Sequence, residues 1–226
     1  MKTIIIYFLI FSLFLVIPFT GNTALTAFSK DVTVRNYVIL DAGHGGVDGG
    51  AISCTGISES NINLEIALRL NDLMHLLGMR TIMICDDDRS VYTEGTTIAT
   101  KKISDIRNRV RIVNETPNAL LVSIHQNNFS DPKYSGAQGF YNNKSNSKEI
   151  TLQLHSAFRE NLDITNKRQP QNSSGVYLME HINCPGVLIE CGFLSNVKEE
   201  AMLRDDTYQK KICSIVATTI CKYLNT

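Results

Sequence analysis

Two histidines each follow an apolar run in this sequence, at the point where the run ends. His44 comes shortly after residues 37–40 and is packed between glycines, and His125 directly follows residues 119–124. Apolar runs of this length, rich in β-branched residues, predict buried strands. In open α/β sheets, ligand sites collect at the carboxyl ends of the strands. The two imidazoles are therefore candidates for one functional site.

The glycines around His44 could also indicate a phosphate-binding loop. The segment 43–50 reads GHGGVDGG, which contains no P-loop motif, and a G-x-G-x-x-G register that starts at Gly43 meets Asp48 where the third glycine should be. A phosphate loop therefore fits poorly. A tight turn with an incidental histidine stays open as an alternative. In the ligand interpretation, the glycines let the backbone bring the imidazole close and leave room for a bulky substrate.

Two carboxylates accompany the histidines. Glu190 lies in the middle of the apolar run GVLIECGF, where a charge is costly unless it is paired, hydrogen-bonded or bound to a metal. Burial should raise its pKa toward the range that a general base needs. A structural carboxylate in a salt bridge is the alternative. Glu59 precedes the first turn of a predicted helix, where a carboxylate commonly complements the helix dipole.

Together these side chains could form a metal site. Two imidazoles and a carboxylate are a known ligand set for catalytic zinc, whose fourth position is left to water. A second carboxylate near that water would take its proton and hand it to a leaving amine. The residues alone predict that His44, His125 and Glu190 share one edge of a sheet with Glu59 beside them, as in a metallohydrolase.

The elements that would position these residues alternate along the chain. The chain pattern predicts strands at 37–40, 81–85, 119–124, 136–142, 176–179 and 186–196, and helices at 59–77, 103–113, 147–158 and 212–224. In the second helix, Ile106 and Val113 belong to the apolar face and Arg107, Arg109 and Arg111 to the opposite face. Such alternation predicts a three-layer α/β/α sandwich, with helices on both faces of a mostly parallel, twisted sheet.

Composition limits the classes of function. The chain has 226 residues, 43% of them hydrophobic, and a formal net charge of zero. This size and composition predict one globular domain with a substantial core. The balanced charge gives no indication of nucleic-acid binding. The six cysteines include no C-x-x-C pair, so we expect buried free thiols at Cys85, Cys191 and Cys213, with one disulfide left open.

The first 27 residues have a different character. A short polar start is followed by an apolar stretch, residues 4–19, and then by small and polar residues up to Ala27. This pattern predicts a signal peptide, with an uncleaved N-terminal membrane anchor as the alternative. In either case residues 28–226 form a single exported catalytic domain, which would contact a membrane only through an uncleaved N-terminal segment.

Four motifs together resemble the zinc-dependent N-acetylmuramoyl-L-alanine amidases of the bacterial cell wall, the amidase-3 family. They are ILDAGHGGVDGGA, ISESNINLEIALRL, LLVSIHQNN and PGVLIECGFLSN. The resemblance implies that one zinc ion is held by His44, Glu59 and His125, and that Glu190 is the catalytic glutamate. It also implies hydrolysis of the amide between the lactyl group of N-acetylmuramic acid and L-alanine of the stem peptide.

A small exported domain of this kind most resembles the sporulation amidases, which remove stem peptides so that muramic-δ-lactam can form in spore cortex. The expected substrate is the peptidoglycan glycan strand with its stem peptides. The expected location is the cell wall or the membrane-associated extracytoplasmic space, including the intermembrane space of a forespore. A non-catalytic peptidoglycan-binding or scaffold homologue, and a zinc peptidase acting on stem peptides, are the alternatives.

The sequence departs from its relatives at two places. Gln126-Asn127 stands where many relatives have Ala-Asn, and Met179-Glu180-His181 replaces a Leu-Arg pair. His181 could contact substrate or the outer shell of the zinc site, or have neither role. The interval between His125 and Glu190 leaves no room for the regulatory helix of some relatives. Control would therefore come from a regulatory or activating protein partner or from metal availability.

Overall fold

The computed structural model of the protein describes residues 36–224. The predicted signal peptide or anchor, residues 1–27, lies outside this part. Among the described residues, every helix is too short or too polar to cross a membrane.

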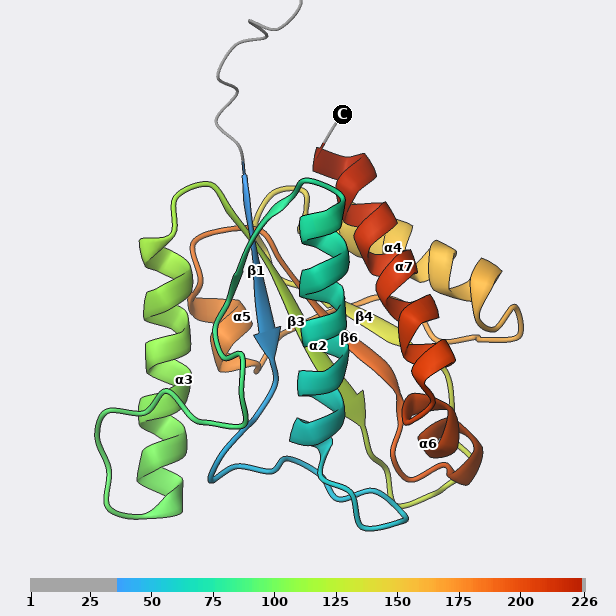
Figure 1. Cartoon of the computed structure of the whole chain (residues 1–226), viewed down its shortest axis with the longest axis horizontal. Helices are drawn as coiled ribbons and strands as arrows, with labels where there is room; N and C mark the ends of the chain where they lie inside the picture. Colours follow the sequence, from blue (N-terminus) through green and yellow to red (C-terminus); the bar gives the residue numbers. More distant parts are fainter. Residues whose placement is uncertain (1–35, 225–226) are drawn as a thin grey trace, which may run out of the picture. The chain divides into compact units, whose positions relative to one another are not determined.

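A six-stranded mixed sheet forms the centre of the described domain (Figure 1). Four neighbouring strands are parallel, and a fifth, β4, pairs antiparallel with β6 and parallel with the two-residue strand β5. In the spatial order of the sheet, the strands are β2 (Arg80–Met83), β1 (Tyr37–Ala42), β3 (Ala119–Asn127), β6 (Gly186–Phe193), β4 (Gln138–Tyr141) and β5 (Gln171–Asn172).

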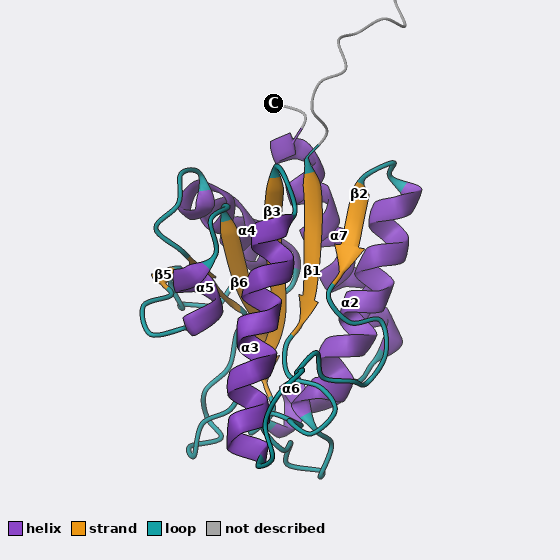
Figure 2. Ribbon diagram, turned by 90° about the vertical axis from the view of Figure 1, so that its left-hand side faces the viewer, coloured by secondary structure: helices purple, strands orange, loops and turns teal. Residues whose placement is uncertain are grey.

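Helices cover both faces of this sheet, as Figures 1 and 2 show. Alternate strand residues point to opposite faces. Val38, Leu40, Val122 and other residues of the first set pack in one core with α2 (Glu59–Leu76), α4 (Ser147–Asn161) and α7 (Asp206–Leu224). Ile39, Leu121 and Leu188 pack in a second core with α3 (Ile98–Glu115) and α5 (Tyr177–His181). The short helix α6 (Val197–Leu203) follows β6. The predicted three-layer α/β/α sandwich is confirmed.

One predicted element is wrong. Residues 176–179, expected as a strand, instead begin the helix α5. Leu178 and Met179 are successive residues and both are buried, which a half-exposed strand with alternating faces would not allow. A run of four apolar residues is too short for periodicity to separate helix from strand.

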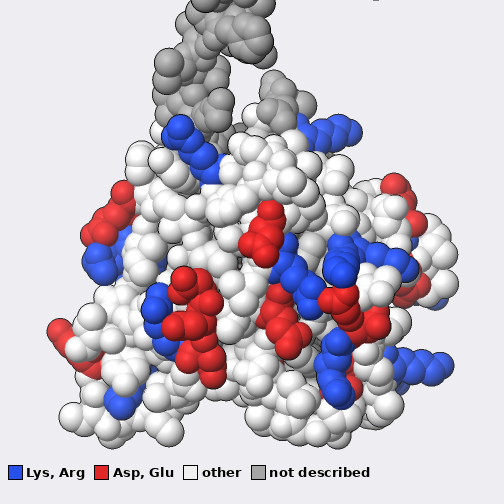
Figure 3. All heavy atoms as spheres, viewed as in Figure 1, with Lys and Arg blue, Asp and Glu red and all other residues white. Residues whose placement is uncertain are grey.

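The surface and the cysteines agree with the expectations from composition. The face drawn in Figure 3 intersperses acidic and basic side chains and has no large patch of one sign. Cys85, Cys191 and Cys213 are buried thiols outside any disulfide, as expected. The core is therefore built without a disulfide at these three positions, and β1, β3 and β6 end side by side at the carboxyl edge of the sheet.

Candidate metal centre

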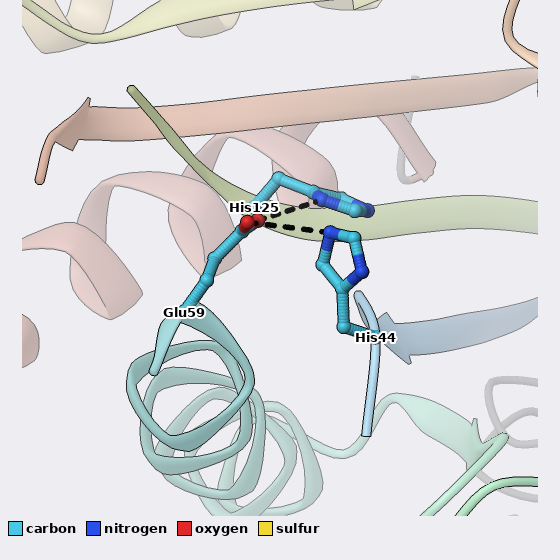
Figure 4. Close-up of side chains that lie close together, drawn as sticks. All are labelled: His44, Glu59 and His125. Carbon is cyan, nitrogen blue, oxygen red and sulfur yellow. Dashed lines mark hydrogen bonds and ion pairs between the residues drawn. The ribbon is translucent and has the colours of Figure 1, made fainter. Parts of the chain in front are cut away.

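Three side chains from different elements converge at this edge (Figure 4). His44 follows β1, Glu59 is the first residue of α2, and His125 lies near the end of β3. Each offers one nitrogen or oxygen atom, and these atoms all lie within 4.8 Å of one another. The structure thus brings together the three residues that the resemblance assigned to zinc.

Glu59 lies between the two imidazoles. Its Oε1 is 3.0 Å from Nδ1 of His125, and its Oε2 is 3.2 Å from Nε2 of His44. The two rings stand nearly perpendicular, with their centroids 5.1 Å apart. Two imidazole nitrogens and one carboxylate oxygen form a donor set that suits zinc and leaves a coordination position open. The residues present therefore fit this metal.

Backbone and side-chain N–H groups fix the Glu59 carboxylate from the other side. Oε2 accepts a hydrogen bond from the backbone N–H of Ala51, and Oε1 accepts from the backbone N–H of Gln126 and from Nδ2 of Asn63. Burial would raise the pKa of Glu59, but its bonds to His125 and His44 hold that pKa well below its usual range. Glu59 is therefore a preformed anion aimed at the two histidines.

Asn63 and Gln126 extend this support. Nδ2 of Asn63 also donates to the carbonyl of Gly43, and Oδ1 of Asn63 accepts from Nε2 of Gln126. Asn63 thus joins the start of α2 to the loop that carries His44. Gln126, which the sequence marked only as a departure from relatives, orients the amide of Asn63. Such outer contacts commonly tune metal affinity.

His44 has a carboxylate partner of its own. Its Nδ1 lies 2.9 Å from Oδ2 of Asp48, and Lys102 donates to the other oxygen of Asp48. Burial would lower the pKa of His44, but the bonds to Glu59 and Asp48 raise it from 6.5 to about 9. The Asp48 contact at Nδ1 leaves Nε2 facing Glu59. The spacing of four residues from His44 was the only signal for Asp48 in the sequence.

The glycines of the loop are needed for this close approach. A Cβ added at Gly43 would overlap the ring of His125. Gly50 has a φ of +69°, and a Cβ there would lie 2.6 Å from Oε2 of Glu59 and 2.7 Å from Cδ2 of His44. His44 itself adopts a left-handed φ of 67°. These contacts support the ligand interpretation of the loop over an incidental turn.

Glu190 lies beside the three converging side chains. It is the direct register partner of His125 on the neighbouring parallel strand, and both line a cavity of about 480 Å³ together with His44. Oε2 of Glu190 is buried and has no hydrogen-bond partner in the described part of the chain. Burial raises the pKa of Glu190 above its usual value. The salt-bridged structural role considered for this carboxylate is not seen among the described residues.

The cavity lies on the face of the sheet that α3 and α5 cover. Its wall is largely apolar, and Lys102 and Asp48 lie in the same lining. The apolar part is formed by Ile103, Ile106, Val176, Leu178 and Leu188. A substrate could therefore reach Glu190 and the two imidazoles from this side.

A buried ion pair between Arg109 and Asp41 supports the loop that carries His44. Arg109, expected on the outer face of its helix, is only 2% exposed, so this prediction is wrong. Its Nη1 donates to Oδ1 of Asp41 and to the carbonyl of Ala42, and its Nη2 donates to the carbonyl of His44. The hydroxyl of Ser123 donates to the other oxygen of Asp41. Arg109 therefore ties α3 to the turn that presents His44.

The remaining histidines lie apart from this group. The ring of His181 stacks on that of Tyr177 with centroids 3.8 Å apart, and its Nδ1 lies 2.9 Å from the carbonyl of Tyr177. The structure does not place His181 in the lining of the cavity. His75 is exposed on α2, and His155 is buried on α4.

Comparisons with known proteins give a consistent result. The family model for N-acetylmuramoyl-L-alanine amidases matches residues 38–222. The germination-specific N-acetylmuramoyl-L-alanine amidase of Bacillus subtilis is 35% identical over 207 residues, which are 91% of this chain and 86% of that protein. The solved CwlD amidase of Clostridioides difficile, in complex with the GerS lipoprotein, is 41% identical with a TM-score of 0.81. That match covers 84% of this chain and 99% of the CwlD chain.

A second solved structure, an N-acetylmuramoyl-L-alanine amidase of Clostridium difficile 630, is 25% identical with a TM-score of 0.74. The match covers 85% of this chain and 98% of that one. Similarity thus extends over nearly the whole described domain.

Proposed function

Since the chain belongs to the N-acetylmuramoyl-L-alanine amidase family, we propose that it is a zinc enzyme. In this proposal, it cuts the amide between the lactyl group of N-acetylmuramic acid and L-alanine of the stem peptide. His44, Glu59 and His125 hold one zinc ion, and Glu190 moves the proton. The observation that carries the proposal is the convergence of three ligand atoms within 4.8 Å beside Glu190, whose buried Oε2 has no hydrogen-bond partner within residues 36–224.

The zinc ion, when bound, polarises the amide carbonyl and lowers the pKa of a water molecule. The residues around it are prepared for a cation. Glu59 brings a negative charge that three N–H donors keep in place, and the Asp48 contact orients His44. Little rearrangement of these side chains is required when the metal enters, which favours binding.

Glu190 is suited to the two proton transfers of amide hydrolysis. As a base it takes a proton from the attacking water, which forms a bond to the carbonyl carbon. It then gives that proton to the nitrogen of L-alanine as the C–N bond breaks, so that a carboxylate and a free amine leave. A carboxylate with a raised pKa, whose buried Oε2 has no competing hydrogen-bond partner among the described residues, is suited both to accept a proton and to return it.

We further propose a role in spore cortex, where removal of stem peptides permits formation of muramic-δ-lactam. The germination-specific amidase of B. subtilis, similar over 91% of this chain, supports this assignment. The CwlD structure, which contains the GerS lipoprotein, supports a regulatory or activating protein partner. The protein would act outside the cytoplasm, in the cell wall or the intermembrane space of a forespore.

Product analysis tests the proposal. The purified protein with zinc is incubated with peptidoglycan, and the new chain ends are identified by mass spectrometry and N-terminal labelling. We expect new N-terminal L-alanine and glycan strands that retain the lactyl carboxylate. Release of a D-amino acid without new N-terminal alanine would instead indicate a zinc peptidase. Binding without any cleavage, with or without a partner protein, would indicate a scaffold homologue.

A further inference from the structure

A cluster of aromatic rings is formed by residues at the ends of β3 and β6, the two strands that carry His125 and Glu190. Phe129 follows β3, Tyr134 lies in the same loop, and Phe193 ends β6. The ring centroids of Phe129 and Tyr134 are 5.1 Å apart, and those of Phe129 and Phe193 are 5.2 Å apart. Phe193 is fully buried, whereas Phe129 is 43% and Tyr134 is 41% exposed. The rings of Phe129 and Tyr134 are therefore partly exposed to solvent, and they lie next to the buried ring of Phe193.

Arg168 completes this cluster, which we call the aromatic platform (Phe129, Tyr134, Arg168 and Phe193). Its guanidinium carbon lies 4.8 Å from the ring centroid of Phe193 and 5.9 Å from that of Phe129. Nε of Arg168 donates to Oε1 of Gln138 at 2.8 Å, and Nη2 donates to the same oxygen. Nη1 has no hydrogen-bond partner among residues 36–224, so it can donate to a ligand.

Gln138 connects the aromatic platform to Glu190. Gln138 is buried and is the register partner of Glu190 in the antiparallel ladder between β4 and β6. Side chains directly opposite each other in such a ladder lie on the same face of the sheet. Arg168 is therefore held beside the carboxylate through Gln138, and the attraction between the Arg168 and Glu190 charges affects the pKa of both groups.

The loop that carries the two exposed rings is fixed by several hydrogen bonds. The backbone N–H of Phe129 donates to the hydroxyl of Ser195, and Nδ2 of Asn196 donates to the carbonyls of Pro132 and Tyr134. At the end of the loop, the backbone N–H of Gly136 donates to Oε1 of Glu199. The rings are thereby presented in a preformed arrangement, which lowers the entropic cost of binding a ligand.

We propose that the aromatic platform binds a sugar ring of the glycan strand, an N-acetylated hexosamine next to the muramic acid whose amide is cut. This inference rests on the proposed function. A hexosamine ring has an apolar C–H face that stacks on aromatic rings, and its acetamido and hydroxyl oxygens accept hydrogen bonds from a guanidinium. Exposed apolar patches with polar neighbours commonly mark ligand-binding sites.

The position of the platform favours sugar over stem peptide. The glycan strand continues in both directions from the muramic acid at Glu190, so an adjacent sugar must cross the neighbouring surface. The platform offers ring faces, and its two neighbouring cations already have partners: Lys133, over the ring of Tyr134, pairs with Asp131, and Arg168 bonds to Gln138. This arrangement suits an uncharged ring better than a peptide with several carboxylates. The apolar cavity on the α3 and α5 side of Glu190 remains available for the stem peptide.

Binding to glycan chains without stem peptides tests the platform, because this probe cannot be a substrate. We expect the purified wild-type protein to bind these chains, and Tyr134→Ala and Phe129→Ala each to weaken binding roughly five- to tenfold. Tyr134→Phe should keep most of the affinity, since it keeps the ring. Leu152→Ala, at an α4 residue that is 49% exposed, serves as the matched control and should change affinity by less than about twofold.

Phe129 packs on the buried Phe193, so each variant is first checked for folding by thermal unfolding. If Phe129→Ala does not fold, the two Tyr134 variants carry the test alone. Absence of binding by the wild type, or equal binding by wild type and Tyr134→Ala, would overturn the platform. So would competition by free stem peptide that is lost in Tyr134→Ala, because the site would then belong to the peptide.

Cleavage assays separate this inference from the proposed function. On polymeric peptidoglycan, Tyr134→Ala should raise KM and leave kcat close to the wild-type value, as expected when binding outside the reacting bond is lost. Glycan binding by a protein that never releases N-terminal alanine would refute the proposed function but not the platform. Unchanged KM in Tyr134→Ala, with normal amide cleavage, would refute the platform alone.

Discussion

Glu59 and Glu190 lie at the same edge of one sheet, but the protein surrounds them differently. The Glu59 carboxylate faces two imidazoles and accepts hydrogen bonds from three N–H groups. Oε2 of Glu190 is buried without a partner among the described residues. The pKa of Glu59 is consequently lowered and that of Glu190 is raised. One carboxylate is prepared to remain an anion beside a cation, and the other is prepared to exchange a proton.

The largest expected effect comes from removing the charge of Glu59. Glu59→Gln keeps an acceptor oxygen but loses the negative charge that a divalent cation requires, so zinc content should fall from about one ion per chain to almost none. Amidase activity should fall to background with it, as it should when a chelator removes the metal from the wild type. Elemental analysis and the cleavage assay are the measurements.

Glu149→Gln, at an exposed residue of α4, is the matched control for Glu59→Gln and should bind zinc normally. Full zinc occupancy in Glu59→Gln would show that Glu59 is not a ligand, and the contrast between the two carboxylates would fail.

Glu190→Gln should lower the activity without lowering the zinc content. The variant keeps both histidines and Glu59, so zinc content should stay at the wild-type level. Loss of the proton-transferring group should lower kcat by about 10²- to 10⁴-fold. Zinc analysis beside single-substrate kinetics separates the two readouts. A variant that loses zinc as well would place Glu190 among the ligands, as the residues alone had left open.

A third carboxylate, Asp41, tests whether a charged partner is enough to keep a buried carboxylate ionised. Burial opposes ionisation of Asp41, but the Arg109 charge and the Ser123 hydroxyl lower its pKa below the ordinary value of 3.8. A lowered pKa means that ionised Asp41 stabilises the fold above about pH 4, and that this contribution is lost as the pH falls further. Asp41→Asn leaves Arg109 buried without this partner and should lower the unfolding free energy at pH 7 by about 3 kcal/mol.

Urea unfolding at pH 7 and at pH 3 measures this effect, with Asp86→Asn at an exposed ion pair as the control. The stability difference between wild type and Asp41→Asn should shrink at pH 3. A difference that is independent of pH would mean that lost packing, rather than the charge of Asp41, destabilises the variant.

The smallest effect concerns the stability of the metal-free protein. Because burial raises the pKa of Glu190 above its ordinary value of 4.5, the ionised form costs folding free energy. This cost grows as the pH rises above the ordinary pKa and is complete above the raised pKa. Glu190→Gln should therefore stabilise the metal-free protein by about 1 kcal/mol at pH 8 and by less at pH 4. Thermal unfolding in a chelator measures it. Destabilisation at pH 8 would indicate a hydrogen-bonded partner for Glu190 and weaken the comparison.

The sequence predicted the fold through its strongest local patterns. The apolar runs that became β1, β3 and β6 each contain both valine and isoleucine, which favour strands, so their assignment was secure. Residues 176–179 failed because a short apolar run fits a helix as well as a strand, and only packing against α3 decides between them. Arg109 failed because helical periodicity shows a face but not a partner, and its partner Asp41 lies 68 positions away.

The sequence indicated which residues form the site better than it indicated how these residues are arranged. Two histidines after two strands and a carboxylate within an apolar run were local signals, whereas Glu59 depended on the resemblance to the family. Asp41, a carboxylate at the end of an apolar run, carried a signal similar to that of Glu190 within its run, and was overlooked. Asn63 and Asp48 gave no comparable signal, because their roles depend on loop geometry that the pattern of residue types does not encode.

The register between β3 and β6 has a consequence for how this site could change during evolution. His125 and Glu190 face the same cavity because they are paired residues on adjacent strands. Their separation is set by backbone hydrogen bonding, so exchange of one apolar strand residue for another leaves it intact. Insertion or deletion of a single residue within either strand would send one of the two side chains to the opposite face. The site should therefore tolerate substitutions of apolar residues in these two strands, but not the insertion or deletion of a single residue in either of them.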